Sequence, residues 1–115
     1  MAIYLSFNIA DSMFEGESVV ARKPLTPERF GEIVRKPGII SCLNGSHATT
    51  IKALESRYNI IVHVPTDPPR ILLKPKDFII VISLRGLPRK TAGYQYDDGD
   101  LENATFSFAL WQRVR

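Results

Sequence analysis

The chain is poor in the residues that build disulfides and metal sites. It has one cysteine, Cys42, and two histidines, His47 and His63. A single thiol excludes an intrachain disulfide, and nothing in the composition indicates secretion. Two scattered histidines and one cysteine do not make a zinc site, and the acidic residues do not cluster as a divalent cation would require. We therefore expect no metal or cofactor, and any catalysis should be metal-independent.

Long apolar runs and runs of one charge are also missing. No stretch approaches the length that crosses a bilayer, and the first residues lack the basic leader and apolar run of a signal peptide. We therefore expect a cytoplasmic protein. The net charge of +3 comes from 15 basic and 12 acidic residues, with no Lys/Arg run. Mild basicity without a basic tract favours a small anionic ligand over a long nucleic acid.

The common catalytic and nucleotide-binding signatures are absent as well. There is no glycine-rich nucleotide loop, no Walker pattern and no GxSxG nucleophile elbow. What remains is ordinary for one globular domain: 115 residues, of which 44% are hydrophobic and 23% charged. A chain of this size and composition can bury a core without covalent staples. We expect a single domain spanning residues 1–115.

The hydrophobic pattern predicts an α+β domain with a mixed sheet and at least two helices. One helix begins at Thr26, with Pro27 in its first turn, and stops at Lys36-Pro37-Gly38. A second runs from about Ser46 to Tyr58. Residues 78–84 form the most apolar run and should be the central strand, buried on both faces. Further strands are expected at residues 3–8, 18–23, 39–43, 60–64 and 105–114.

The stretch 44–50 concentrates residues with chemical potential. Gly45 permits a tight turn, and Ser46 can cap the helix that follows. His47 then falls in the first helical turn, where unpaired N–H groups and the helix dipole favour an anion such as phosphate. A histidine can exchange a proton near neutral pH. The stretch is therefore either a phosphate pocket with a built-in acid or base, or a Ser-capped helix with an exposed histidine.

Other candidates lie where predicted strands end. Asn8 follows the first strand and is either a pocket residue or a turn residue. Arg70 follows a proline-rich loop and Arg85 ends the central strand. Arginine can clamp phosphate through two hydrogen bonds, although a solvated strand end explains the position of Arg70 as well. His63 should be a structural or surface residue, and Cys42 a buried thiol. The polar segment 89–102 is expected to be a long loop, either a lid or a variable loop.

Taken in order, these features resemble a known family, the small viral ring nucleases that act as anti-CRISPR proteins against type III systems. The resemblance rests on a Tyr4-Leu5 strand with a nearby Asn, the His47-Ala48-Thr49-Thr50 element, Arg70 after a proline loop, and a long apolar strand ending in Arg85 before Leu87-Pro88. It covers most of the chain. It implies a small α/β two-fold dimer that binds cyclic tetra-adenylate in a symmetric pocket. It further implies that a ribose 2′-hydroxyl attacks the adjacent phosphate without metal, which would leave linear products with a 2′,3′-cyclic phosphate.

The resemblance also implies roles for particular residues. His47 would be the general acid that protonates the departing 5′-oxygen. Arg85 would offset charge in the transition state. The ligand would be held by Asn8, Ser46, Thr50 and Arg70.

The chain departs from the family pattern at three places, and these departures keep other functions open. Ser46 stands where the family usually has glycine, and Val81 stands where it often has a glutamine that faces the ligand. A catalytic glutamate is also missing, because the stretch after Arg85 reads Gly86-Leu87-Pro88-Arg89-Lys90. The loop acids Asp97, Asp98 or Asp100 are candidates to replace it. The alternatives are a cyclic-nucleotide-binding protein that sequesters without cutting, and a small DNA- or protein-interaction protein of a virus or mobile element.

Overall fold

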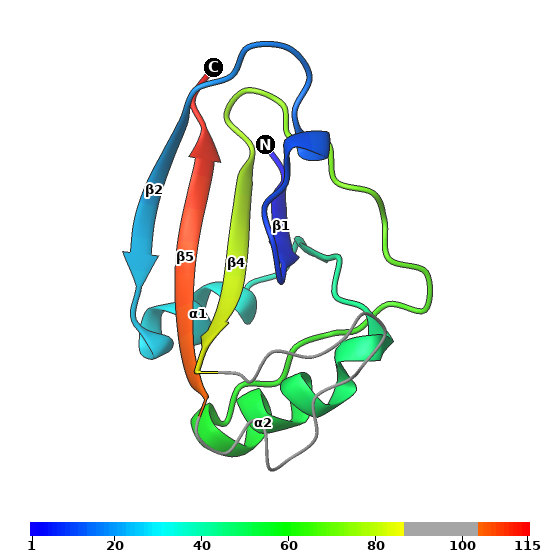
Figure 1. Ribbon diagram of the computed structural model, residues 1–115, viewed down its shortest axis with the longest axis vertical. Coiled ribbons are helices and arrows are strands. Elements are labelled where there is room, and N and C mark those ends of the chain that lie inside the picture. Colours follow the sequence, from blue (N-terminus) through cyan, green and yellow to red (C-terminus); the bar gives the residue numbers. More distant parts are fainter. Residues whose placement is uncertain (87–103) are drawn as a thin grey trace.

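The computed structural model describes residues 1–86 and 104–115. These residues form one five-stranded sheet with two α-helices, in the strand order β2-β5-β4-β1-β3 (Figure 1). This arrangement confirms the predicted α+β class and mixed sheet. The predicted loop 89–102, with its aspartates and a possible helical turn, lies outside the described residues. The elements are β1 (Ile3–Ser6), η1 (Asp11–Met13), β2 (Val20–Leu25), α1 (Pro27–Val34), β3 (Ile39–Ser41), η2 (Gly45–His47), α2 (Ala48–Tyr58), β4 (Phe78–Arg85) and β5 (Thr105–Arg113).

Three neighbouring strands run parallel, so they end at one edge of the sheet. β1 pairs in parallel with both β3 and β4, while β5 is antiparallel to β4 and β2. We call the edge where β1, β3 and β4 end the carboxyl edge. The last β1 pair joins Ser6 to Val81, whereas β4 continues to Arg85. These further residues carry β4 about 13 Å beyond the end of β1. The carboxyl edge is therefore stepped rather than straight.

β4 is the central strand, as its apolar run predicts, and both of its faces are buried. Ile80 and Ile82 pack in the larger core cluster with residues of α1 and α2. Ile79 and Val81 belong to a smaller cluster on the other face, where Met13 and residues of the 71–73 segment cover the sheet. Alternate side chains of a strand point to opposite faces. Cluster membership therefore identifies a helix side of the sheet and an opposite side.

Both helices follow their sequence signals at most positions. The Thr26 Oγ1 accepts a hydrogen bond from the Arg29 N–H at 3.1 Å, and Pro27 is the first residue of α1. Leu54 is fully buried, while Ile51 and Tyr58 pack against the core from the same face of α2. α2 ends at Tyr58, and its C-cap residue Asn59 has a left-handed φ of 55°. None of the described helices is long and apolar enough to cross a bilayer.

The strand predicted at residues 60–64 is wrong. Ile60 and Val62 are buried while Ile61 and His63 are exposed, so the alternation of a strand is present. The segment nevertheless joins no ladder among the described residues. Instead, the Ser41 hydroxyl donates a hydrogen bond of 2.5 Å to the His63 carbonyl oxygen. His63 is a surface residue, as expected, and residues 65–69 are irregular.

A buried carboxylate ties the first residues of the chain to the turn before β4. Asp77 is 6% exposed and accepts hydrogen bonds from the Ala2 N–H at 2.8 Å and the Lys74 N–H at 3.0 Å. Burial by itself raises the pKa of Asp77, but the two main-chain bonds and the positive charges of the N-terminus and Lys74 together lower it by more, so the net pKa lies below its ordinary value. The charged form is therefore the one that stabilises the fold.

Replacing this carboxylate should destabilise the protein. Asp77→Ala leaves two partly buried N–H groups without an acceptor, which should lower the free energy of unfolding by about 2–4 kcal/mol at neutral pH. Because the pKa is lowered in the folded state, this stability is present above about pH 4 and is lost as the pH falls through the folded pKa. Urea unfolding at neutral and acidic pH measures both effects. The exposed Asp67→Ala is the matched control, and a wild-type advantage over Asp77→Ala that persists unchanged in acid would contradict the assignment.

Candidate functional site

The carboxyl edge gathers most of the candidate residues. Asn8 follows β1, the stretch 44–50 follows β3, and Arg85 ends β4. The Cys42 N–H donates to the Leu5 carbonyl oxygen at 2.8 Å, which keeps the chain leaving β3 beside the chain leaving β1. Ligands of α/β sheets commonly bind beyond the carboxyl ends of parallel strands. The topology therefore places these residues where a ligand site is usual.

The helix at this edge begins differently from the prediction. A short 3-10 turn, η2, precedes α2, and Asn44 caps this turn because its Oδ1 accepts the Ser46 N–H at 2.9 Å. The His47 N–H donates to the Asn44 carbonyl oxygen at 3.0 Å, which closes the short 3-10 turn η2. α2 then begins at Ala48 rather than near Ser46, with His47 as its N-cap residue. An asparagine side chain readily bonds the N–H two residues on, so Asn44 caps η2, and the predicted Ser46 cap of α2 is wrong.

His47 presents its side chain at this helix start. The imidazole is exposed and contacts the Phe7 ring, with the ring centroids 4.7 Å apart and the planes tilted by 40°. Within the described chain, no side-chain hydrogen bond engages either imidazole nitrogen. Neutral imidazole has one donor and one acceptor nitrogen, and here both are open to a ligand. The arrangement suits proton transfer to or from a bound molecule.

The other predicted ligand residues near His47 differ in exposure. Asn8 is exposed, its Oδ1 accepts from the Ser6 hydroxyl at 3.2 Å, and its side-chain NH2 group has no hydrogen-bond partner among the described residues. Ser46 is exposed, whereas Thr50 is 5% exposed. Thr50 is therefore largely buried beside the exposed His47. Asn8 and Ser46 are the better placed of the three to contact a ligand.

Arg85 lies on the opposite side of the sheet from the helices. Ile82 and Leu84 belong to the helix-side cluster, so the alternation of β4 directs Ser83 and Arg85 to the other face. In the β4–β5 ladder Ser83 pairs with Ser107 and Arg85 pairs with Thr105. A guanidinium and three hydroxyls therefore share one face at the projecting end of β4. The hydroxyls were missed from sequence, although polar residues alternating with Phe106 and Phe108 signal this face.

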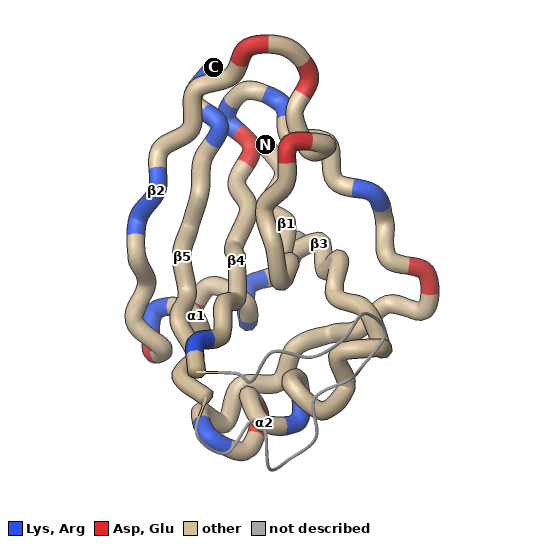
Figure 2. The backbone as a smooth tube through the Cα atoms, in the orientation of Figure 1, with Lys and Arg blue, Asp and Glu red and all other residues tan. Residues whose placement is uncertain are grey.

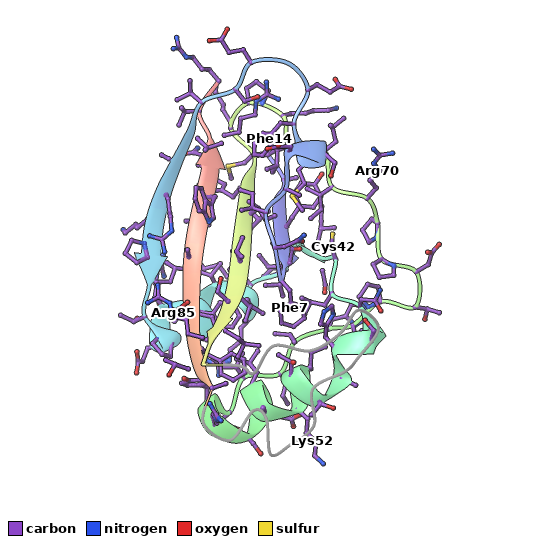
Figure 3. All side chains as sticks on the ribbon, in the orientation of Figure 1. Phe7, Phe14, Cys42, Lys52, Arg70 and Arg85 are labelled. Atoms are coloured by element: carbon purple, nitrogen blue, oxygen red, sulfur yellow. The ribbon has the colours of Figure 1, made fainter. Side chains whose placement is uncertain are left out.

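Arg70 is not brought to the carboxyl edge. It is exposed on the irregular segment before residue 71. Figure 3 shows its side chain pointing outward from the outer loop, well away from both Phe7 and Arg85. Within one chain, Arg70 and Arg85 therefore do not form a joint clamp.

Cys42 is not a reactive partner for His47. Its side chain is half-buried and packs against the smaller cluster, and its Sγ lies 3.9 Å from the Ile40 carbonyl oxygen. Burial raises the pKa of the Cys42 thiol, which favours the protonated form. Over residues 1–86 and 104–115, no three His, Cys, Asp or Glu side chains gather as metal ligands would.

The charged positions of the described residues do not gather on one surface. In the described part of the chain, Lys and Arg positions are spread over β2, the strand ends and the helices, with acidic positions among them (Figure 2). A cavity of about 450 Å³ lies between α1 and the end of α2, lined in part by Glu28, Glu32, Arg35 and Tyr58. It is at the far end of α2 from His47 and contains none of the candidate residues.

Comparison with known proteins gives a relationship of fold. A scan against protein-family models finds no match, and a search of curated proteins finds no relative. Among solved structures, the chain is similar to B116 of Sulfolobus turreted icosahedral virus, with a TM-score of 0.66 and 14% identity. The alignment covers 96% of this chain and 98% of that one. The chain therefore shares its whole fold with a small protein of an archaeal virus.

Proposed function

We propose that this protein is a metal-independent ring nuclease that cleaves cyclic tetra-adenylate and so antagonises type III CRISPR signalling. The observation that carries the proposal is the exposed His47 imidazole, with both nitrogens open, at a helix start on the carboxyl edge. The sequence resemblance supplies the substrate, and the shared fold with a virus protein agrees with a viral role.

The proposed reaction needs one acid and one site of positive charge. A ribose 2′-hydroxyl attacks the adjacent phosphorus and loses its proton to solvent. The bond from phosphorus to the 5′-oxygen then breaks, and protonated His47 gives its proton to that oxygen. Arg85 offsets the negative charge that gathers on the phosphate oxygens. The products are a 5′-hydroxyl and a 2′,3′-cyclic phosphate.

A two-fold dimer is part of the proposal. A ring of four identical nucleotides has a two-fold axis, as a dimer of two identical chains has. The carboxyl edge of each chain would therefore engage half of the ring. His47 and Arg85 lie on opposite sides of one sheet. A second copy offers a way for the imidazole of one chain to meet the guanidinium of the other.

A second function is favoured by one feature of the sequence. No acidic residue occurs in the stretch from Arg85 to Lys90, where the family carries its glutamate. A protein with the binding residues but without this assistance would hold the ring and release it intact. Sequestration of a cyclic nucleotide is therefore the alternative.

One experiment separates these functions. Protein is incubated with cyclic tri-, tetra- and hexa-adenylate in excess chelator, and the products are resolved by chromatography, with binding measured by calorimetry. A nuclease yields linear products with a 2′,3′-cyclic phosphate from cyclic tetra-adenylate. Tight binding with full recovery of the ring indicates sequestration. Neither binding nor cleavage of any ring would overturn both proposals.

A further inference from the structure

We infer that Phe7 is the positioning residue for His47, and that its ring fixes the imidazole at the carboxyl edge. The kinetic consequence of this inference rests on the proposed function, whereas the ring contact is a property of the folded chain. Neither the hydrophobic pattern nor the His47-Ala48-Thr49-Thr50 element singles out Phe7.

The His47 side chain has little else to hold it. His47 is the N-cap residue of α2, with φ −99° and ψ 24°, and its side chain makes no capping hydrogen bond. In the part of the chain that the structure describes, the ring contact with Phe7 is the interaction its imidazole makes. A side chain on an exposed helix end otherwise samples several rotamers. The Phe7 ring therefore selects among them.

Phe7 can do this because its own position is fixed. It directly follows β1, is half-buried, and packs against the helix-side core cluster. Two features fix how the end of β1 lies relative to the end of β3. Leu5 is opposite Ser41 in the β1–β3 register, and the Cys42 N–H donates to the Leu5 carbonyl oxygen. Parallel pairing thus brings Phe7 beside His47, and the contact between the two rings limits the orientation of the imidazole.

A phenylalanine positions a histidine without occupying its nitrogens. A carboxylate or carbonyl partner would take up one ring nitrogen and fix the tautomer. A tilted aromatic contact limits the orientation of the ring, while both nitrogens stay free to bind a phosphate or a leaving oxygen. This is what a general acid at an open edge needs.

The inference is tested with Phe7→Leu, which keeps apolar bulk but removes the ring, and Phe7→Tyr, which keeps the ring. NMR of the free protein reports the ring-current displacement of the His47 Hδ2 and Hε1 signals, assigned by their loss in His47→Ala. We expect the displacement to vanish in Phe7→Leu and to persist in Phe7→Tyr. The matched control is Phe14→Leu, a half-buried phenylalanine of the smaller cluster, which should leave these signals unchanged.

Kinetics give the second readout. In Phe7→Leu we expect kcat for ring cleavage to fall about tenfold with KM little changed, because the acid is misplaced rather than lost, and Phe7→Tyr should restore kcat. An unchanged ring-current displacement in Phe7→Leu overturns the inference. A lost displacement with an unchanged kcat overturns the positioning role while the nuclease proposal stands. If the wild-type protein cleaves nothing, the nuclease proposal fails, and the displacement alone still decides whether Phe7 fixes the imidazole.

Discussion

His47→Ala is expected to cleave cyclic tetra-adenylate about 10²–10⁴-fold more slowly than the wild-type protein while still binding it. The leaving 5′-oxygen departs poorly as an alkoxide, so removal of the proton donor slows bond cleavage much more than ring binding. Single-turnover reactions in chelator measure the rate, and calorimetry with the same variant measures the affinity. The exposed His47 side chain carries no buried contact network, so the fold should survive the change.

The second histidine provides the control for this prediction. His63→Ala removes an exposed imidazole, while the His63 carbonyl oxygen that accepts the Ser41 bond remains. It should cleave at the wild-type rate. Added imidazole should restore part of the rate of His47→Ala, because a small space opens beside Phe7. Equal rates for wild type and His47→Ala would remove His47 from the mechanism.

The sequence predicts the sheet and helices well where burial alone decides the structure. The run 78–84 is apolar on both faces because β4 is covered by helices on one side and by residues such as Met13 on the other. Residues 60–64 show the limit of such patterns. Their alternation reflects real burial of Ile60 and Val62, but a strand also needs a neighbour to pair with. A pattern of side chains does not reveal whether that neighbour exists.

The start of α2 shows a different limit. Asn44 and Ser46 are both good helix caps by intrinsic preference. The choice between them depends on the backbone entering the turn, where Asn44 is extended with φ −108° and ψ 139°. In that conformation its side chain accepts the Ser46 N–H and caps η2, the short turn that precedes α2. Local propensity places the helix correctly within a few residues, but it does not determine the residue at its cap.

The candidate site was predictable only in part. The sequence indicates which residues are candidates, whereas strand order and register decide which of them lie together. Motif order identifies His47 and Arg85, and strand ends identify Asn8. Strand order and register decide which of these meet, and they place Phe7 against His47 and Ser83 opposite Ser107. Arg70 was grouped with Arg85 because both follow features typical of ligand clamps. The irregular course of residues 61–75 instead carries Arg70 to a different side of the molecule (Figure 3).

Arg85→Ala is expected to lower the rate of ring cleavage by about 10²–10³-fold, since it removes a preorganised cation from the developing phosphate charge. Arg85→Lys should recover only part of this loss, because an ammonium lacks the two-pronged geometry of guanidinium. Arg29→Ala is the control for charge alone, as Arg29 is exposed on α1 and paired with Glu32. A wild-type rate for Arg85→Ala would contradict the assignment.

Measuring Arg70→Ala beside Arg85→Ala tests whether the pocket is built from two chains. Within one chain its guanidinium points away from the carboxyl edge, so Arg70→Ala should have little effect if each chain supplies a complete site. A loss comparable to that of Arg85→Ala would mean that the ring is clamped by residues of two copies. In that case, mixing the inactive Arg70→Ala and Arg85→Ala proteins should restore cleavage, because each mixed dimer then holds one site with both arginines intact. Failure of the mixture to recover activity, with both variants inactive alone, would place both arginines in a site built from one chain and contradict the outward position of Arg70.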